Sequence, residues 1–151
     1  MGILNLASGD SCWRGYRYYE EKRVLELQRP DGTHLQARVA GSGAEPYNVT
    51  LDLEHIRRSS CDCPLAAGRR VICKHMVSAY FAAFPEEAKK YYADVLRAER
   101  EWEDEQAALA DKLERYVRTL KRKDAQDRLL EVLEMAPDWL WERFVRDYVV
   151  E

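Results

Sequence analysis

Three of the four cysteines and one of the three histidines in this 151-residue chain fall within fifteen consecutive positions. Cys61 and Cys63 are separated by one residue, and Cys73 and His75 repeat that spacing after a nine-residue gap. Thiolates and an imidazole are donors that zinc prefers, and structural zinc sites use four of them in a tetrahedral arrangement. The pattern predicts one structural zinc ion bound by Cys61, Cys63, Cys73 and His75.

The one-residue spacing requires a backbone geometry that directs both ligands of a pair to the same side. Residues i and i+2 of an extended strand point to the same side, so Cys61 and Cys63 at a strand end can reach one ion. Cys73 and His75 can do the same at the entry to the following helix. Pro64 fixes the chain direction after the first pair, and Gly68 lets the connecting loop turn.

Other chemistry fits the cysteines less well. Clustered cysteines can be buried small hydrophobes, but the paired spacing argues against that interpretation. A reactive-cysteine enzyme needs a base, an orienting group and an open site, and His34 and His55 lie in strand-like segments as ordinary surface residues. A catalytic metal keeps one position for water, whereas four protein ligands leave none. We therefore expect no catalytic residues, and we interpret Cys12 as a free thiol without an assigned role.

The segment before the cysteines resembles a series of strands. "GYRYYEEKRVLEL" suits two strands and a short turn, and Pro30-Asp31-Gly32 is a strong turn signal between two alternating runs. Val49, Leu51 and Leu53 then alternate with polar residues, as in a half-buried strand. These features predict a three- or four-stranded antiparallel meander.

The segment after the cysteines is helical. Met76, Ala79, Tyr80 and Ala83 share one helical stripe from His75 onward, and Pro85 ends that helix and can begin the next. Residues 86 to about 121 contain no glycine or proline; two shorter helices follow over 124–136, capped by Asp124, and 137–150, opened by Pro137. The predicted class is α+β, with a β-meander and zinc-stapled finger over residues 1–85 and a helical region over residues 86–151.

The long helix carries a 3-4 heptad stripe that Glu99 and Gln106 interrupt; its members are Tyr92, Val95, Trp102, Leu109, Leu113, Tyr116 and Leu120. A helix of this length exceeds a domain of this size, so it either breaks near residues 99–106 or uses part of its surface to contact a partner. We expect the last two helices to fold back and bury their apolar side chains, which include Leu129, Leu133, Trp141 and Phe144.

Composition and charge indicate the cellular compartment and the number of functional regions. The chain is 46% hydrophobic and 34% charged, and it contains neither an apolar run of about 20 residues nor a recognisable secretory signal. We expect a cytoplasmic protein without a membrane contact, because reduced thiols are available there for metal binding. The net charge of −3 divides into +2 over residues 1–85 and −5 over residues 86–151, which suggests two functional regions.

Five cations surround the cysteine cluster: Arg57, Arg58, Arg69, Arg70 and Lys74. With Asp62, three thiolates and Zn²⁺ included, the segment 57–75 carries a net charge of +3. The cations can offset the charge of the thiolates, or they can contact phosphates in a salt-dependent complex with nucleic acid. The sequence leaves both interpretations open.

The pattern C-x-C-x9-C-x-H, with proline after the second cysteine and lysine before the histidine, resembles the SWIM zinc finger, and the resemblance extends over residues 14 to 84. It implies a ββα-like finger with zinc ligands at the four positions named above. SWIM domains occur with Swi/Snf-type ATPases and Mutator-type transposases and are commonly proposed to bind DNA or protein. This chain shows neither a P-loop nor a transposase core, so those activities do not carry over. Two functions remain as expectations: a DNA-associated zinc module, or an adaptor whose helical region binds a protein.

Overall fold

The computed structural model describes residues 2–150. Its sheet has the order β1-β2-β3-β4, from strands Val24–Gln28, His34–Val39, Tyr47–Asp52 and Ser60–Cys61. Every neighbouring pair is antiparallel, so the predicted meander is confirmed. The turn before β2 is built as expected, because Asp31 accepts hydrogen bonds from the backbone N–H groups of Thr33 and His34. These bonds, led by that of Thr33, lower the pKa of Asp31 to about 2.

Residues 15–20, predicted to be a strand, are helical instead. Helix α1 spans Ile3–Leu6 and α2 spans Gly9–Glu20. Ser8 caps α2 by accepting the N–H of Ser11, and Tyr16 and Tyr19 then fall on one side of the helix, with ring centroids 6.0 and 6.2 Å from that of Phe81. Aromatic residues favour strands only where the tertiary environment agrees, and here the packing against Phe81 favours the helix.

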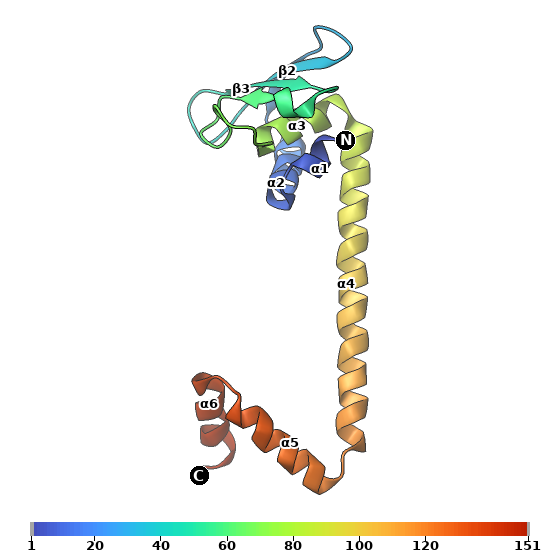
Figure 1. The fold of residues 1–151 in the computed structure, drawn as a ribbon, viewed down its shortest axis with the longest axis vertical. Coiled ribbons are helices and arrows are strands. Elements are labelled where there is room, and N and C mark those ends of the chain that lie inside the picture. The colour runs from blue at the N-terminus through green and yellow to red at the C-terminus, as the bar shows by residue number, and fades with distance from the viewer. Residues whose placement is uncertain (1, 151) are drawn as a thin grey trace. The chain divides into compact units, whose positions relative to one another are not determined.

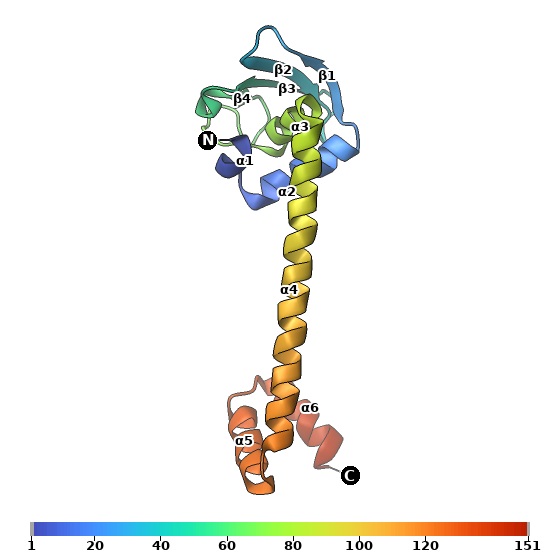
Figure 2. The same cartoon turned by 90° about the vertical axis from the view of Figure 1, so that its right-hand side faces the viewer.

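Helix α3, Lys74–Ala83, lies between the sheet and α2 (Figures 1 and 2). The inner face of the sheet buries alternate side chains, among them Leu35, Val39 and Leu51. Six of the ten residues of α3 are buried, as expected for a helix covered on two sides. The sheet and α2 therefore both pack against α3.

Three further helices complete the chain: α4 over Pro85–Thr119, α5 over Arg122–Glu134 and α6 over Asp138–Tyr148. Helix α4 runs without a break near residues 99–106, which was one of the two alternatives for a helix of this length. The N-cap of α5 is Lys121, and Asp124, the predicted cap, lies in the first turn instead. Two compact units result, one reaching to Arg97 and the other beginning at Ala98. Within residues 2–150, no helix combines the length and apolarity needed to cross a membrane.

The burial expected for the last two helices is not found. No described residue of α5 or α6 is buried. Leu129 and Trp141 are 46% and 52% exposed, whereas Leu133 and Phe144 are half-buried. The apolar pattern showed that these side chains need cover, but a helical stripe does not specify the surface that provides it.

Candidate metal centre

The four residues of the cluster reach one point from three different segments. Cys61 ends β4, where it pairs with Val49 of β3, and Cys63 follows two residues later. Cys73 is the N-cap of α3, and His75 lies in the first turn of that helix. All four side chains are buried, and their ligand atoms lie within 4.8 Å of one another. The structure therefore brings together all the predicted ligands, and we call them the metal cluster.

The residue between the first two cysteines holds both of them inward. The Asp62 carboxylate accepts the backbone N–H of Asn48 at 2.9 Å and the Asn48 side-chain amide at 2.8 Å. These bonds fasten the exposed Asp62 to the outer side of β3. Because neighbouring residues of an extended segment point to opposite sides, Cys61 and Cys63 both turn toward the interior. The sequence analysis missed this function of Asp62.

The loop between the two cysteine pairs is also anchored at both ends. The carbonyl of Cys63 accepts the N–H groups of Ala66 and Ala67, at 3.0 and 2.9 Å, which starts a tight turn. Gly68 adopts a φ of 70°, a conformation that glycine takes without steric cost. Ile72 is buried immediately before Cys73. The loop therefore returns the chain to the cluster by defined contacts.

The donor set and its spacing fit a zinc ion. His75 Nδ1 lies 3.8 Å from the Sγ of Cys61 and 3.8 Å from the Sγ of Cys73. A tetrahedral zinc with Zn–S bonds of about 2.3 Å and Zn–N bonds of about 2.0 Å separates its ligands by about 3.5–3.8 Å. Three sulfurs and one imidazole nitrogen that lie within 4.8 Å of one another can hold one zinc with no open position. The cluster is thus suited to a structural ion.

The imidazole ring of His75 is oriented by aromatic packing. Its centroid lies 4.6 Å from the ring of Tyr47 and 5.5 Å from the ring of Tyr18. The Nε2 atom is buried and has no hydrogen-bond partner among the described residues. The two tyrosines therefore take the place of the carboxylate or carbonyl that commonly orients a metal-binding histidine.

Two of the thiols differ in acidity. The pKa of Cys73 is lowered to about 4, chiefly by the hydrogen bond from the Cys61 thiol, with contributions from His75 and the backbone N–H of Met76. The same Cys61–Cys73 hydrogen bond and burial raise the pKa of Cys61. Without a metal, the Cys61 thiol therefore keeps its proton and donates a hydrogen bond to the Cys73 thiolate. Metal binding has to displace that proton.

The five predicted phosphate-binding cations do not share one surface. Arg57, Arg58 and Arg70 line one pocket of about 670 Å³, whose other lining residues are Leu6, Glu54, His55 and Ile56. Arg57 and Arg70 also line the adjoining pocket of about 210 Å³. Arg69 lies in neither. The structure thus groups three of the five, which we call the arginine pocket.

Lys74 contributes to a different hollow. It lines a pocket of about 330 Å³ beside the metal cluster, together with Arg14, Tyr47 and Leu65. Its Nζ lies 4.4 Å from the ring centroid of Tyr18, a cation–π contact. This contact anchors Lys74 close to the tyrosine that packs against His75. Lys74 is therefore placed to support the metal cluster, apart from the arginine pocket.

The arginine pocket is positioned by two polar residues that the sequence analysis did not single out. Asp52 accepts the N–H groups of Glu54 and His55, at 3.0 and 2.6 Å. The hydroxyl of Ser59 accepts the N–H of Asp52 at 3.1 Å. Together they hold the short helix η1, Ile56–Arg58, between β3 and β4. The available signal was the aspartate at the last position of β3, a few residues before η1.

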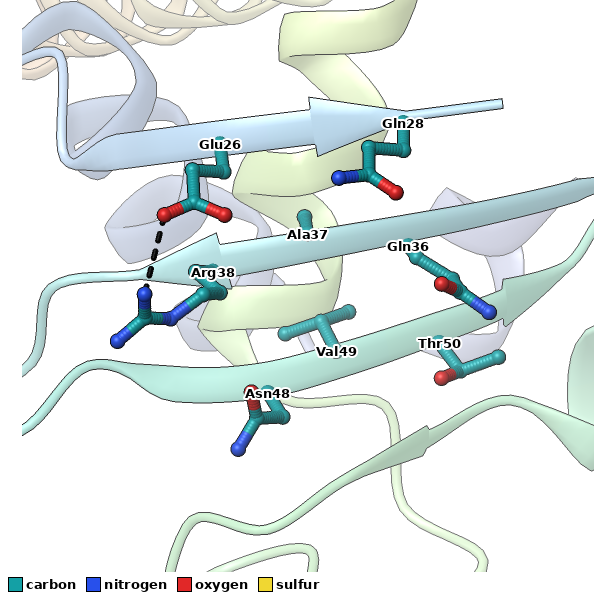
Figure 3. Close-up of a pocket in the computed structure, with 8 residues that line it drawn as sticks. All are labelled: Glu26, Gln28, Gln36, Ala37, Arg38, Asn48, Val49 and Thr50. Atoms are coloured by element: carbon teal, nitrogen blue, oxygen red, sulfur yellow. Dashed lines mark hydrogen bonds and ion pairs between the residues drawn. The ribbon is translucent and has the colours of Figure 1, made fainter. Parts of the chain in front are cut away.

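The outer face of the sheet is polar, and its described residues form no group that could hold a metal ion. A shallow hollow of about 360 Å³ there is lined by Glu26, Gln28, Gln36, Ala37, Arg38, Asn48, Val49 and Thr50 (Figure 3). Arg38 Nη1 lies 3.0 Å from the Glu26 carboxylate, across β1 and β2. Apart from Ala37 and Val49, which are buried, these side chains are the polar half of the strand alternation and face solvent, while the other half packs on α3.

Comparison with known proteins identifies one segment of the chain. A family model described as the SWIM zinc finger matches residues 47–84. The match begins at β3, ends after α3 and includes the whole metal cluster as well as the arginine pocket residues 57, 58 and 70. Comparison with curated proteins gave no match, and comparison with solved structures gave none either.

Proposed function

We propose that this protein, which carries a SWIM zinc finger at residues 47–84, is a DNA-associated module in which zinc has a structural role. The observation that carries the proposal is the arginine pocket, where three arginines of the finger line one hollow. Zinc would be held by Cys61, Cys63, Cys73 and His75. Bound there, it would supply a rigid link between β4 and α3.

A structural role for the ion agrees with a non-enzymatic protein. Four protein ligands occupy the tetrahedral positions of zinc, so water has no place to be activated. The three sulfurs must remain reduced to bind, which favours a compartment such as the cytoplasm. We therefore propose that the finger acts by binding and not by catalysis.

The arginines of the pocket have their donors available for an external anion. Within the part of the chain that the structure describes, Arg57, Arg58 and Arg70 form no ion pair. None of the three donates a hydrogen bond to a cluster sulfur in those residues either. This weakens the interpretation that they only offset the thiolate charge. A planar guanidinium forms two parallel hydrogen bonds with a phosphate, so the pocket suits the DNA backbone.

Fluorescence anisotropy with a labelled DNA duplex tests the proposal. The zinc-loaded chain should bind weakly, and three phosphate contacts should make log K fall with log[salt] at a slope of about −3. Affinity should change little between duplex sequences, because phosphate contacts carry no sequence information. Salt-independent binding, or no binding at low salt, would contradict a backbone contact through the arginine pocket.

A second function, a protein-interaction adaptor, is favoured by a different observation. Helices α4, α5 and α6 leave many large apolar side chains exposed, among them Trp102, Leu113, Leu130 and Trp139, each at least 60% exposed. Exposed aromatic and aliphatic side chains are enriched where proteins contact one another. On this alternative, residues 86–151 contact a protein and the zinc finger is purely structural.

A further inference from the structure

Helix α4 presents an apolar stripe that its own chain leaves exposed. Trp102, Leu109, Leu113 and Tyr116 are 63%, 59%, 60% and 51% exposed. Leu120, half-buried, follows directly after the last helical residue. The intervals of seven, four, three and four residues place these five at a and d positions of a heptad repeat. Such a seam is typical of a helix that packs against another helix.

The charges along this part of the chain are polarised. Residues 99–105 of α4 contain five carboxylates and one arginine, whereas residues 117–123, which comprise the end of α4, the turn after it and the first two residues of α5, contain four basic residues and no acidic one. The seam of apolar residues runs from the acidic segment to the basic segment. A parallel copy would place acidic against acidic and basic against basic, which is destabilising. An antiparallel copy would place each segment opposite its complement.

We propose that the seam of α4 binds a second copy of this chain in the antiparallel orientation. Aligning the acidic segment of one copy with the basic segment of the other places Trp102 opposite the second copy's Leu120. The same alignment places Leu109 opposite Leu113 and Gln106 opposite Tyr116. Each pair joins a d position to an a position, as the layers of an antiparallel coiled coil require.

The alignment also accounts for both interruptions of the apolar stripe. Gln106 enters a layer with Tyr116, where its amide and the phenol hydroxyl can satisfy each other. Glu99 lies beyond the point where the second copy's α4 ends, so it enters no apolar layer. In a parallel pair, Gln106 would face Gln106 and Glu99 would face Glu99. The polar residues are therefore compatible with the antiparallel orientation and disfavour the parallel one.

The opposite side of the helix remains suited to solvent. Asp104, Asp111 and Arg118 occupy the outward positions, and Arg118 pairs with Glu114 at 2.6 Å within the same helix. An exposed pair of this kind contributes little to stability and can rearrange when a second helix arrives. The pairing uses only residues from the unit that begins at Ala98, so it is independent of DNA binding by the finger.

Mixed disulfide trapping tests the orientation on the full zinc-loaded chain. Leu109→Cys and Leu113→Cys are prepared separately, one of them with an affinity tag, and oxidised together. The antiparallel pair should give a disulfide between the two different variants, because side chains of one layer approach within disulfide range. Asp111→Cys, on the outward side, and the unmodified chain are the controls and should give none. A Leu109→Cys homodimer in place of the mixed product would overturn the antiparallel orientation.

Sedimentation tests the association itself. The unmodified chain should pass from monomer to dimer between about 1 μM and about 300 μM, a range that brackets a micromolar dissociation constant. Leu113→Lys should weaken dimerisation at least about tenfold, because it would bury a charge in the seam, while its zinc content and DNA affinity stay unchanged. A chain that stays monomeric over the whole range, or a Leu113→Lys variant that dimerises normally, would overturn the proposal.

Discussion

The Sγ of Cys61, in the edge strand β4, lies 3.8 Å from Nδ1 of His75, in the first turn of the central helix α3. Strand β4 has only two residues and pairs with β3 alone. Its attachment to α3 therefore depends on the metal cluster. Because structural zinc contributes binding free energy to folding, metal removal should loosen β4 and the loop after it before the rest of the sheet.

Replacing one ligand should release the metal. Cys61→Ser should lower zinc affinity by more than about 100-fold, since loss of even an indirect partner of a ligand costs about 10- to 100-fold. Cys12→Ser is the control, because Cys12 is equally buried but bonds to the carbonyl of Leu4, away from the cluster. Metal analysis of both purified variants provides the measurement. Full zinc occupancy in Cys61→Ser would remove Cys61 from the ligand set.

Zinc affinity should rise with pH. The pKa of Cys73 is lowered to about 4, so near neutral pH this residue is already a thiolate and releases no proton. The pKa of Cys61 is raised, so the metal must displace its proton, and affinity should fall by at least about tenfold for each unit of decreasing pH. Below the lowered pKa of Cys73, a further proton competes and the fall steepens. Competition with a chelator at several pH values measures this, and a flat profile would contradict it.

A glycine in α2 permits the close approach of α3. A Cβ at Gly15 would lie 2.5 Å from the Cβ of Val77 and 2.9 Å from the carbonyl oxygen of Lys74. Neither atom belongs to a flexible side-chain end, so Gly15→Ala should lower the free energy of unfolding by about 1–3 kcal/mol.

Gly9→Ala supplies the matched control for this substitution. Gly9 is the first residue of the same helix, and a Cβ there meets nothing within 4 Å. That variant should be neutral or more stable by up to about 1 kcal/mol, because alanine favours helix. Denaturant unfolding compares both variants, and equal stabilities would show that α2 and α3 can separate without cost.

The composition of the arginine pocket predicts which basic residues contribute to DNA binding. Arg57→Glu combined with Arg70→Glu should weaken DNA binding at least about tenfold and reduce the salt slope by about 2, because each of the two arginines would no longer bind a phosphate. Arg17→Glu combined with Arg69→Glu changes the net charge equally, but both side chains lie outside the pocket. An equal weakening in the two variants would indicate attraction by net charge alone, without a defined site.

The sequence by itself determined the parts of this protein whose signals are local. The one-residue spacing of the cysteine pairs identified the four cluster residues, because strand and helix-entry geometry constrain neighbours in the same way in any fold. The turn at Asp31 was predictable from the sequence because an aspartate there accepts hydrogen bonds from backbone groups two and three residues away. Pro85 likewise marked the boundary between α3 and α4.

Only the tertiary structure decided the features that depend on distant partners. The aromatic run at residues 15–20 became helical because Phe81 and α3 offered a surface that suits a helix. Arg70 joined Arg57 and Arg58 while its neighbour Arg69 did not, because the path of the loop after Gly68 sets which side each residue faces. The exposed side chains of α5 and α6 show the same limit. Periodicity specifies which face of a helix is apolar, whereas packing between segments specifies what, if anything, covers it.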